Sequence, residues 1–385
     1  RCKTGYAKRT RGYSLVHKSI HSRDGINVGR SRINKHRKTN EKKVKWKDNG
    51  SWRQQMINYP LNIKRSEWEN LNEEEQIKFR QEVIIYFRKY GFPHFKYDIE
   101  EQHKELGRLD KFVSNNEMET DGIIRQTMHG LGLCWSYHPH HWDIHCGTSK
   151  TPMEVFLDDN LLDKSIKKRM RNGRNITEAM MRKTFKVSGG AQTVSNFRPS
   201  VARYIYDKYG GDSVFDPCMG FGGRLLGAIS SPRVKHYEGC DPNTKTFNGL
   251  SEMTKNLQDT TKVVLNNIGV EEYESKDKFD LVFTSPPYFD TEKYSEEETQ
   301  SYIKFPTYEK WLNGFLRKLI SNGIDSLNKG GYFIINIANT KMYPTLENDF
   351  LEIMELYDMS LEKILRMKLS KQHSGGQFKY EPIFV

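Results

Sequence analysis

Short apolar runs alternate with amphipathic helical patterns in the second half of the chain, beyond Thr193. Alternation of this kind is typical of strands that run parallel and are joined by helices. It predicts an α/β fold with a mostly parallel sheet and helices on both faces. The expected strands are 213–215, 235–239, 262–265, 280–284, 331–337 and 380–385, and the expected helices are 222–229, 308–327 and 346–356.

The first half of the chain has a different pattern. A helix is predicted from Asn72, its amino-terminal cap, to Gly91, its stop, with Glu75 bonding back to the cap. Residues 93–150 are rich in aromatic side chains and histidine without a clear period, and 159–171 read as a second, basic helix. This part therefore predicts mixed, partly helical structure.

Positive charge is concentrated at the amino-terminal end. Residues 1–53 hold 17 of the 61 Lys and Arg but only three of the 49 Asp and Glu, in a chain with net charge +12. Such a segment can neutralise several phosphates and release their counterions, which favours nucleic acid as a partner. A solvated tail without a partner is the alternative. The basic helix 159–171 is a second candidate for phosphate contacts.

Three regions are expected on these grounds. They are a basic nucleic-acid-binding arm at 1–60, a mixed helical region at 61–191 and an α/β domain at 192–385. The 385 residues suffice for a large domain and a second module, each with its own core.

The cellular compartment is indicated by the absence of long apolar runs and of a disulfide pattern from this sequence. There is no run of about 18 apolar residues, and the first residues are basic rather than apolar. The five cysteines are scattered and odd in number, unlike a disulfide framework. We expect a soluble cytoplasmic protein without a membrane partner, trimmed at both ends.

A glycine-rich loop follows the first expected strand of the α/β domain. It runs from Asp216 through Gly220 and Gly222 into a helix, so its backbone can approach a ligand closely beside the helix dipole. The spacing differs from the dinucleotide-binding pattern. Asp216 could balance an amino or sulfonium group, and Asp241, after the next strand, could accept hydrogen bonds from ribose hydroxyls. This pair suits S-adenosylmethionine better than a pyrophosphate, although a plain glycine turn remains the alternative.

A polar tetrad, Ser285-Pro286-Pro287-Tyr288, ends a buried strand at the same edge of the sheet. An aromatic exocyclic amine is a poor nucleophile because its lone pair is delocalised into the ring, so it needs hydrogen-bond acceptors rather than a strong base. The Ser285 hydroxyl and the Pro286 carbonyl can accept its two hydrogens while the prolines fix the backbone. Tyr288 can stack on a base that has been flipped out of a duplex.

The loop and the tetrad together resemble the motifs of the amino-group DNA methyltransferases, which methylate cytosine N4 or adenine N6. The resemblance covers residues 192–385 and implies a Rossmann-like class I methyltransferase fold, S-adenosylmethionine as cofactor and double-stranded DNA as partner. A second copy of the chain or an associated restriction enzyme are the protein partners that it suggests. Serine at the first position of the tetrad is more typical of the cytosine-N4 enzymes, so cytosine is the first choice and adenine the second.

The resemblance also assigns roles to individual residues. The catalytic residues would be Ser285, Pro286, Pro287 and Tyr288. The cofactor contacts would be Phe197, Arg198, Pro199, Asp216, Pro217, Gly220, Gly222, Asp241 and Thr284. Arg198 stands where the family usually has lysine, which leaves its role less defined. No metal ligand is implied.

Other activities are open alternatives. The same tetrad can serve RNA or a protein amide, and a chain with an inactive domain would be a DNA-binding specificity subunit. Methylation at cytosine C5 is excluded because Cys218 lies in the cofactor loop and the chain has no Glu-Asn-Val sequence.

Two further segments are ambiguous. Residues 134–146 contain seven metal-ligand side chains among aromatic residues, without a paired Cys-x-x-Cys, so zinc is an alternative to a base-binding or phosphate-binding surface. Asp290, Glu292 and Tyr294 either border the base pocket or belong to a surface loop.

Overall fold

The computed structural model describes residues 63, 65–172, 176–258, 260–371 and 378–385. The basic arm predicted at 1–60 lies outside these residues. The described residues form one compact unit.

In the described residues, a nine-stranded sheet organises this unit, in the order β1-β2-β10-β11-β9-β7-β4-β5-β6. The strands within residues 192–385 are β4 (Ser213–Asp216), β5 (His236–Cys240), β6 (Lys262–Asn266), β7 (Phe279–Thr284), β9 (Leu327–Asn336), β10 (Ile364–Lys371) and β11 (Phe378–Phe384). Pairing is parallel from β6 to β9, and β11 is antiparallel to both β9 and β10. Among these seven strands β11 is the one that is reversed, and this mostly parallel order is the predicted Rossmann-like class I fold.

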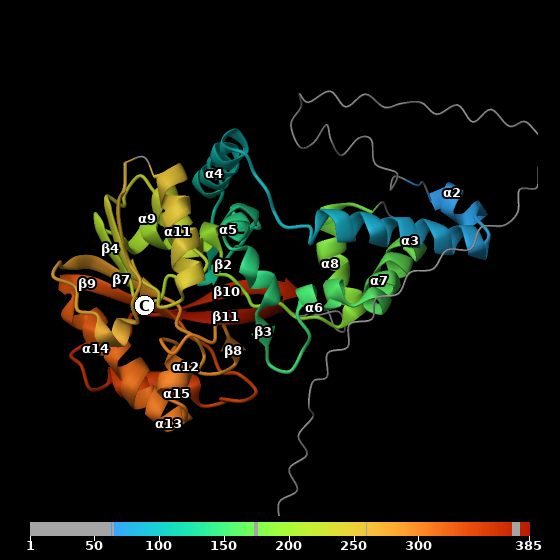
Figure 1. Ribbon diagram of the computed structural model, residues 1–385. Helices are drawn as coiled ribbons and strands as arrows, with labels where there is room; N and C mark the ends of the chain where they lie inside the picture. The colour runs from blue at the N-terminus through green and yellow to red at the C-terminus, as the bar shows by residue number, and fades with distance from the viewer. Residues whose placement is uncertain (1–62, 64, 173–175, 259, 372–377) are drawn as a thin grey trace, which may run out of the picture. The chain divides into compact units, whose positions relative to one another are not determined.

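Helices cover both faces of the sheet (Figure 1). One face carries α9 (Pro199–Tyr209), α10 (Gly223–Ser230) and α11 (Thr244–Leu257), and the other carries α13 (Tyr308–Trp311), η4 (Leu312–Leu316), α14 (Arg317–Asp325) and α15 (Leu346–Met354). Side chains alternate between two cores, as the pleat of a strand requires. Phe283 packs on the first core and Val282 on the second, and both are fully buried.

The region at 61–191 contributes to two cores. Five helices, α2 (Arg65–Asn70), α3 (Glu73–Tyr90), α6 (Pro152–Leu157), α7 (Asp159–Arg171) and α8 (Glu178–Gly189), enclose a separate aromatic core. In contrast, α4 (Ile99–Ser114), β1 (Glu119–Thr120), β2 (Ile123–Ile124) and α5 (Leu131–Tyr137) pack on the sheet domain. The sheet domain thus includes elements that precede residue 192.

Caps begin the helices of this region. Asn72 forms the predicted capping box with Glu75, and the N–H of Gly91 closes the last turn of α3 on Phe87. α4 and α6 begin with capping boxes of the same kind, at Asp98 and Thr151. None of the described helices is long and apolar enough to cross a membrane.

Two short segments connect the helical region to the sheet domain. η2 (Pro139–Asp143) leads into β3 (His145–Cys146), which pairs antiparallel with β8 (Glu292–Lys293), just beyond the tetrad. Ile144, Val194 and Phe221 form a small apolar cluster beside this ladder. The remaining short elements are η3 (Val270–Glu272) and α12 (Ser301–Lys304).

Candidate active site

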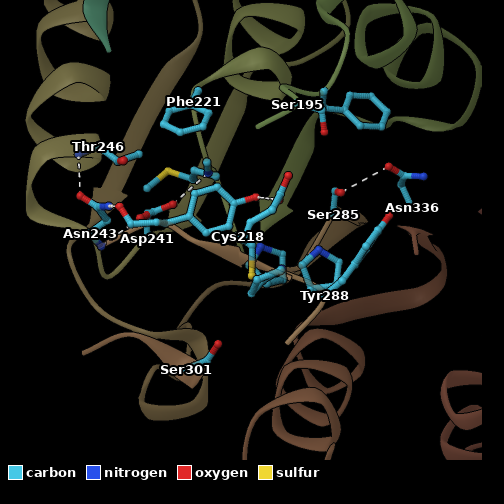
Figure 2. Close-up of a pocket in the computed structure, with 18 of the residues that line it drawn as sticks. Ser195, Cys218, Phe221, Asp241, Asn243, Thr246, Ser285, Tyr288, Ser301 and Asn336 are labelled. Carbon is cyan, nitrogen blue, oxygen red and sulfur yellow. Dashed lines mark hydrogen bonds between the residues drawn. The ribbon is translucent and has the colours of Figure 1, made fainter. Parts of the chain in front are cut away.

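A cavity of about 200 Å³ lies at the carboxyl ends of β4, β5 and β7 (Figure 2). Both predicted motifs line it, so the glycine-rich loop and the tetrad share one cleft. The predicted site residues that line the cavity are Phe197, Arg198, Pro217, Gly220, Asp241, Ser285, Pro286, Pro287 and Tyr288. The predicted residues that do not line it are Pro199, Asp216, Gly222 and Thr284.

The loop after β4 needs its glycines. Gly220 and Gly222 have φ of 54° and 74°, in the left-handed region that favours glycine. Gly223 is held so closely that a Cβ on it would lie 2.1 Å from the carbonyl oxygen of Phe197. The loop is therefore packed against the segment that holds Phe197 and Arg198, and this contact forms one wall of the cavity.

Asp216 occupies a different place from the one predicted. Its carboxylate is fully buried and accepts hydrogen bonds from the Arg224 guanidinium, at 2.9 and 3.1 Å, and from the Tyr237 hydroxyl, at 2.7 Å. The charge of Asp216 is therefore balanced inside the domain and does not face a ligand. Arg224 also donates to the carbonyl of Cys218, so this ion pair fixes the start of the glycine-rich loop.

Asp241, in contrast, lines the cavity. One carboxylate oxygen accepts the N–H of Gly220 and the other the N–H of Asn243, both at 2.9 Å. Burial raises the pKa of Asp241 to about 7, and the two backbone N–H groups oppose this rise. The carboxylate is thus positioned to accept further hydrogen bonds from a ligand, and such donors would favour its charged form.

Ser285 is oriented by a strand that sequence reasoning did not connect with it. Its hydroxyl donates to the side-chain oxygen of Asn336, at 3.3 Å, at the end of β9 (Figure 2). Asn336 donates in turn to the carbonyl of Pro382 on β11, at 2.8 Å. Because the hydroxyl proton is directed to Asn336, the oxygen lone pairs of Ser285 are left to accept hydrogens from another group.

Tyr288 and its neighbours form the wall beside the tetrad. The Tyr288 hydroxyl donates to the Glu381 carboxylate of β11, at 3.0 Å, and burial raises the pKa of Tyr288 well above its usual value. Burial also raises the pKa of Glu381 and of Glu292, which accepts a hydrogen bond from Tyr294. Glu292 and Tyr294 border the cavity, as one of the two sequence hypotheses held.

Asn336 and Glu381 were not found from the sequence. They belong to no motif, and their position depends on the insertion of β11 between β9 and β10, which no local pattern indicates. Asp290, the third member of the ambiguous group, does not line the cavity and accepts a hydrogen bond from Tyr343. A polar residue at the end of a predicted strand, such as Asn336, is the signal that would have found part of this set.

The histidine-rich segment supports the cavity from outside. The ring nitrogens of His138 lie 2.7 and 3.2 Å from the carbonyl oxygens of Cys134 and Thr246, and a neutral ring donates to one of these two oxygens. His140 bonds to the Thr246 hydroxyl at 3.1 Å. Burial lowers the pKa of each imidazole to about 4, so both are neutral near pH 7. Their rings lie 5.6 and 5.7 Å from the ring of Phe221, which lines the cavity. In the described residues, these side chains therefore act as hydrogen-bonding and packing groups.

Comparison with known proteins adds little at the level of sequence. No protein-family model matches the chain, and no curated protein matches it. The solved structures that resemble it include the N-methyltransferase NodS from Bradyrhizobium japonicum WM9, with 12% identity, 48% of this chain and 90% of that chain covered, and a TM-score of 0.33.

Two further solved structures resemble the same share of the chain. They are a precorrin-6y C5,15-methyltransferase from Geobacter metallireducens GS-15, with 13% identity, 48% and 85% coverage and a TM-score of 0.32, and a putative RNA methyltransferase from Pyrococcus horikoshii, with 15% identity, 48% and 79% coverage and a TM-score of 0.31. These likenesses are too slight to decide the activity or the substrate of this chain.

Proposed function

We propose that the chain is an S-adenosylmethionine-dependent methyltransferase that methylates the exocyclic amine of a flipped DNA base, with cytosine N4 preferred to adenine N6. The observation that carries this proposal is the shared cavity, in which Asp241 and the glycine-rich loop face the Ser285 to Tyr288 tetrad. Two half-sites with complementary chemistry within one cleft are what a transfer between two bound molecules requires.

The cofactor half-site fits an adenosyl ligand with an amino-acid tail. Asp241 would accept hydrogen bonds from the ribose hydroxyls, and the loop from Pro217 to Gly220 would lie against the ligand. The bound cofactor would supply an electrophilic methyl group on its sulfonium. Asp216 would act indirectly, because its ion pair with Arg224 holds the loop in place.

The tetrad would bind the target amine. Ser285 and the Pro286 carbonyl would each accept one N–H hydrogen, which directs the nitrogen lone pair at the methyl carbon. Asn336 keeps the Ser285 hydroxyl in the accepting orientation. Tyr288 would provide the stacking surface that offsets part of the cost of flipping the base. The N–CH3 bond would form as the S–CH3 bond breaks, the sulfur would leave as the thioether of S-adenosylhomocysteine, and the methylated nitrogen would then lose one proton to water.

Charge favours a nucleic acid as substrate, and the resemblance of the tetrad to that of the DNA amino-methyltransferases favours DNA. The 17 Lys and Arg of residues 1–53 favour a polyanion, and α7 carries exposed basic side chains at its carboxyl end. Serine at the head of the tetrad favours cytosine. Adenine N6 is the second candidate, and RNA or protein methylation the third.

The decisive test is methyl transfer from labelled S-adenosylmethionine to mixed-sequence duplex DNA, followed by mass spectrometry of the nucleosides. We expect N4-methylcytosine, and a loss of about 100-fold in rate for Ser285→Ala, which removes one acceptor. The matched control is Ser321→Ala on α14. The Ser321 hydroxyl donates to the backbone carbonyl of Lys318, outside the cavity, so this variant should keep full activity.

The other products are informative in their own right. If the product is N6-methyladenine, adenine rather than cytosine is the target base. If the label appears only in RNA or only in a protein, the DNA proposal is wrong. Cofactor binding without transfer to any of these substrates would identify the chain as an inactive specificity subunit.

A further inference from the structure

Three metal-ligating side chains meet near the amino-terminal edge of the sheet, the edge opposite to the cavity. His236 and Glu238 lie two residues apart on β5, so the pleat of the strand directs both side chains to one face. Asp277 comes from the turn that precedes β7. One potential ligand atom from each lies within 4.8 Å of the other two, and no other group of this kind occurs among the residues that the structure describes.

The imidazole of His236 has an unused nitrogen in this cluster. Its Nε2 atom is buried and has no hydrogen-bond partner within the described part of the chain. A buried polar atom without a partner is costly, so such atoms are uncommon in folded proteins. One ring nitrogen of His236 lies within 4.8 Å of an oxygen of each carboxylate, and no hydrogen bond joins the imidazole to either group in the described residues. A cation between them would satisfy all three groups at once.

The two carboxylates are available in different ways. Glu238 is 4% exposed, and one of its oxygens accepts the Tyr273 hydroxyl at 2.8 Å, which orients the group and leaves the other oxygen free. Asp277 is exposed, and its carboxylate makes no hydrogen bond or ion pair with described residues. Carboxylates that bind metals are commonly held in place by a hydrogen bond from a neighbouring residue, as Tyr273 holds Glu238 here.

The donor set selects the type of ion. One imidazole nitrogen and two carboxylate oxygens suit zinc and similar ions, whereas calcium and magnesium take oxygen ligands. Zinc lies about 2.0–2.2 Å from such ligands, so two ligands of one ion are separated by about 3–4 Å. The three ligand atoms lie within 4.8 Å of one another, so a small closure of the cluster would reach that size, and Asp277, the exposed member, has the most freedom to move.

We propose that His236, Glu238 and Asp277 bind one divalent ion of the zinc type, with water completing the coordination. The ion links the turn before β7 to β5 and stabilises this edge of the sheet. It takes no part in the chemistry of the cavity, because it lies at the other end of the strands. The inference therefore stands independently of the proposed methyl transfer.

The test is titration of the EDTA-treated full chain with Co²⁺, read by its visible absorption, followed by displacement with Zn²⁺. His236→Gln and Asp277→Asn should each remove one bound equivalent or weaken it at least tenfold, and should abolish the rise in melting temperature that Zn²⁺ gives the unaltered chain. His103→Gln, which changes an exposed histidine on α4, is the matched control and should bind as the unaltered chain does.

The comparison between variants decides the outcome, because the chain holds other histidines and cysteines. If both site variants bind Co²⁺ and gain stability as the control does, the ion binds elsewhere and the proposal is wrong. If His236→Gln does not fold, Asp277→Asn decides alone, since its exposed side chain contributes little to the core. Absence of any bound equivalent in the unaltered chain also rejects the proposal.

Discussion

Ser285 has the hydrogen-bonding partner that its proposed role requires. A serine hydroxyl both donates and accepts, and it presents lone pairs to a target amine only while its own proton is directed elsewhere. Asn336 accepts that proton and is itself fixed by the Pro382 carbonyl. The acceptor therefore depends on β9 and β11 as well as on the tetrad.

Asn336→Ala should lower the rate of methyl transfer about 10- to 100-fold without weakening cofactor binding, because the Ser285 hydroxyl loses its fixed orientation. A double-mutant cycle tests this reason. If Asn336 acts through Ser285, the double variant Ser285→Ala with Asn336→Ala is no slower than Ser285→Ala alone. Losses that multiply would instead show that Asn336 acts independently. Single-turnover rates and calorimetry with S-adenosylhomocysteine measure the two quantities.

Asp241 predicts a pH dependence of cofactor binding. Burial raises the pKa of Asp241 from 3.8 to about 7, so the folded chain without ligand binds a proton that the unfolded chain has lost. Its burial therefore destabilises the fold increasingly as pH rises from about 4 to 7, and by a constant amount above 7. A ligand that donates to the carboxylate requires the charged form, which is abundant only above pH 7.

Affinity for S-adenosylhomocysteine should accordingly fall by up to about tenfold for each pH unit below 7, and stay level above it. Asp241→Asn should bind more weakly and lose this dependence. Calorimetry between pH 5.5 and 8.5 measures both. If the affinity of Asp241→Asn still fell below pH 7, a group other than Asp241 would be responsible for the pH dependence.

At the scale of elements, the glycine-rich loop depends on a contact that leaves no room for a side chain. Gly223→Ala places a Cβ 2.1 Å from the Phe197 carbonyl oxygen, so either the loop or the segment before α9 must move. We expect a loss of about 1–3 kcal/mol in the free energy of unfolding and weaker cofactor binding. Chemical denaturation and calorimetry measure these effects.

Gly107→Ala is the control for that substitution. Gly107 lies within α4, where an added Cβ meets nothing within 4 Å. Alanine is the better helix former, so this variant should gain up to about 1 kcal/mol and keep its affinity. If Gly223→Ala and Gly107→Ala changed the free energy of unfolding and the cofactor affinity equally, the close contact at Gly223 would not be important for the loop.

The elements that sequence predicted best are those with a local signal. β4 and β7 are short apolar strands followed by polar motifs, and their predicted limits agree with the structure within one residue. β10 was missed, although Leu365 and Met367 are buried and Arg366 is exposed in strict alternation. The partners of the tetrad were missed for another reason, because only the order of strands in the sheet places Asn336 and Glu381 beside it.

At the scale of the whole molecule, we expect DNA binding by the basic amino-terminal segment and cofactor binding in the cavity to be independent of each other. Replacing Lys42, Lys43, Lys45 and Lys47 by glutamine should weaken DNA binding and reduce the slope of log affinity against log salt by up to about 0.9 for each lost phosphate contact. Cofactor affinity should not change, because the cavity is built wholly from residues 195–381.

The matched control replaces four exposed lysines of the catalytic domain, Lys310, Lys318, Lys329 and Lys341. It removes the same charge and should leave the salt slope nearly intact. Equal effects of the two variants would show that net charge alone, rather than the amino-terminal segment, governs binding. Fluorescence anisotropy at several salt concentrations separates these cases.

The short ladder between β3 and β8 joins the helical region to the rim of the cavity. Cys146 pairs with Glu292, and Ile144 packs with Val194 and Phe221, so one segment contacts both half-sites. A displacement of the helices on engaging a target would be transmitted mechanically to Glu292 and Phe221 together. Under the proposed function, recognition of the target sequence and closure of the cavity would then be coupled. A duplex without the target sequence would leave the cavity open.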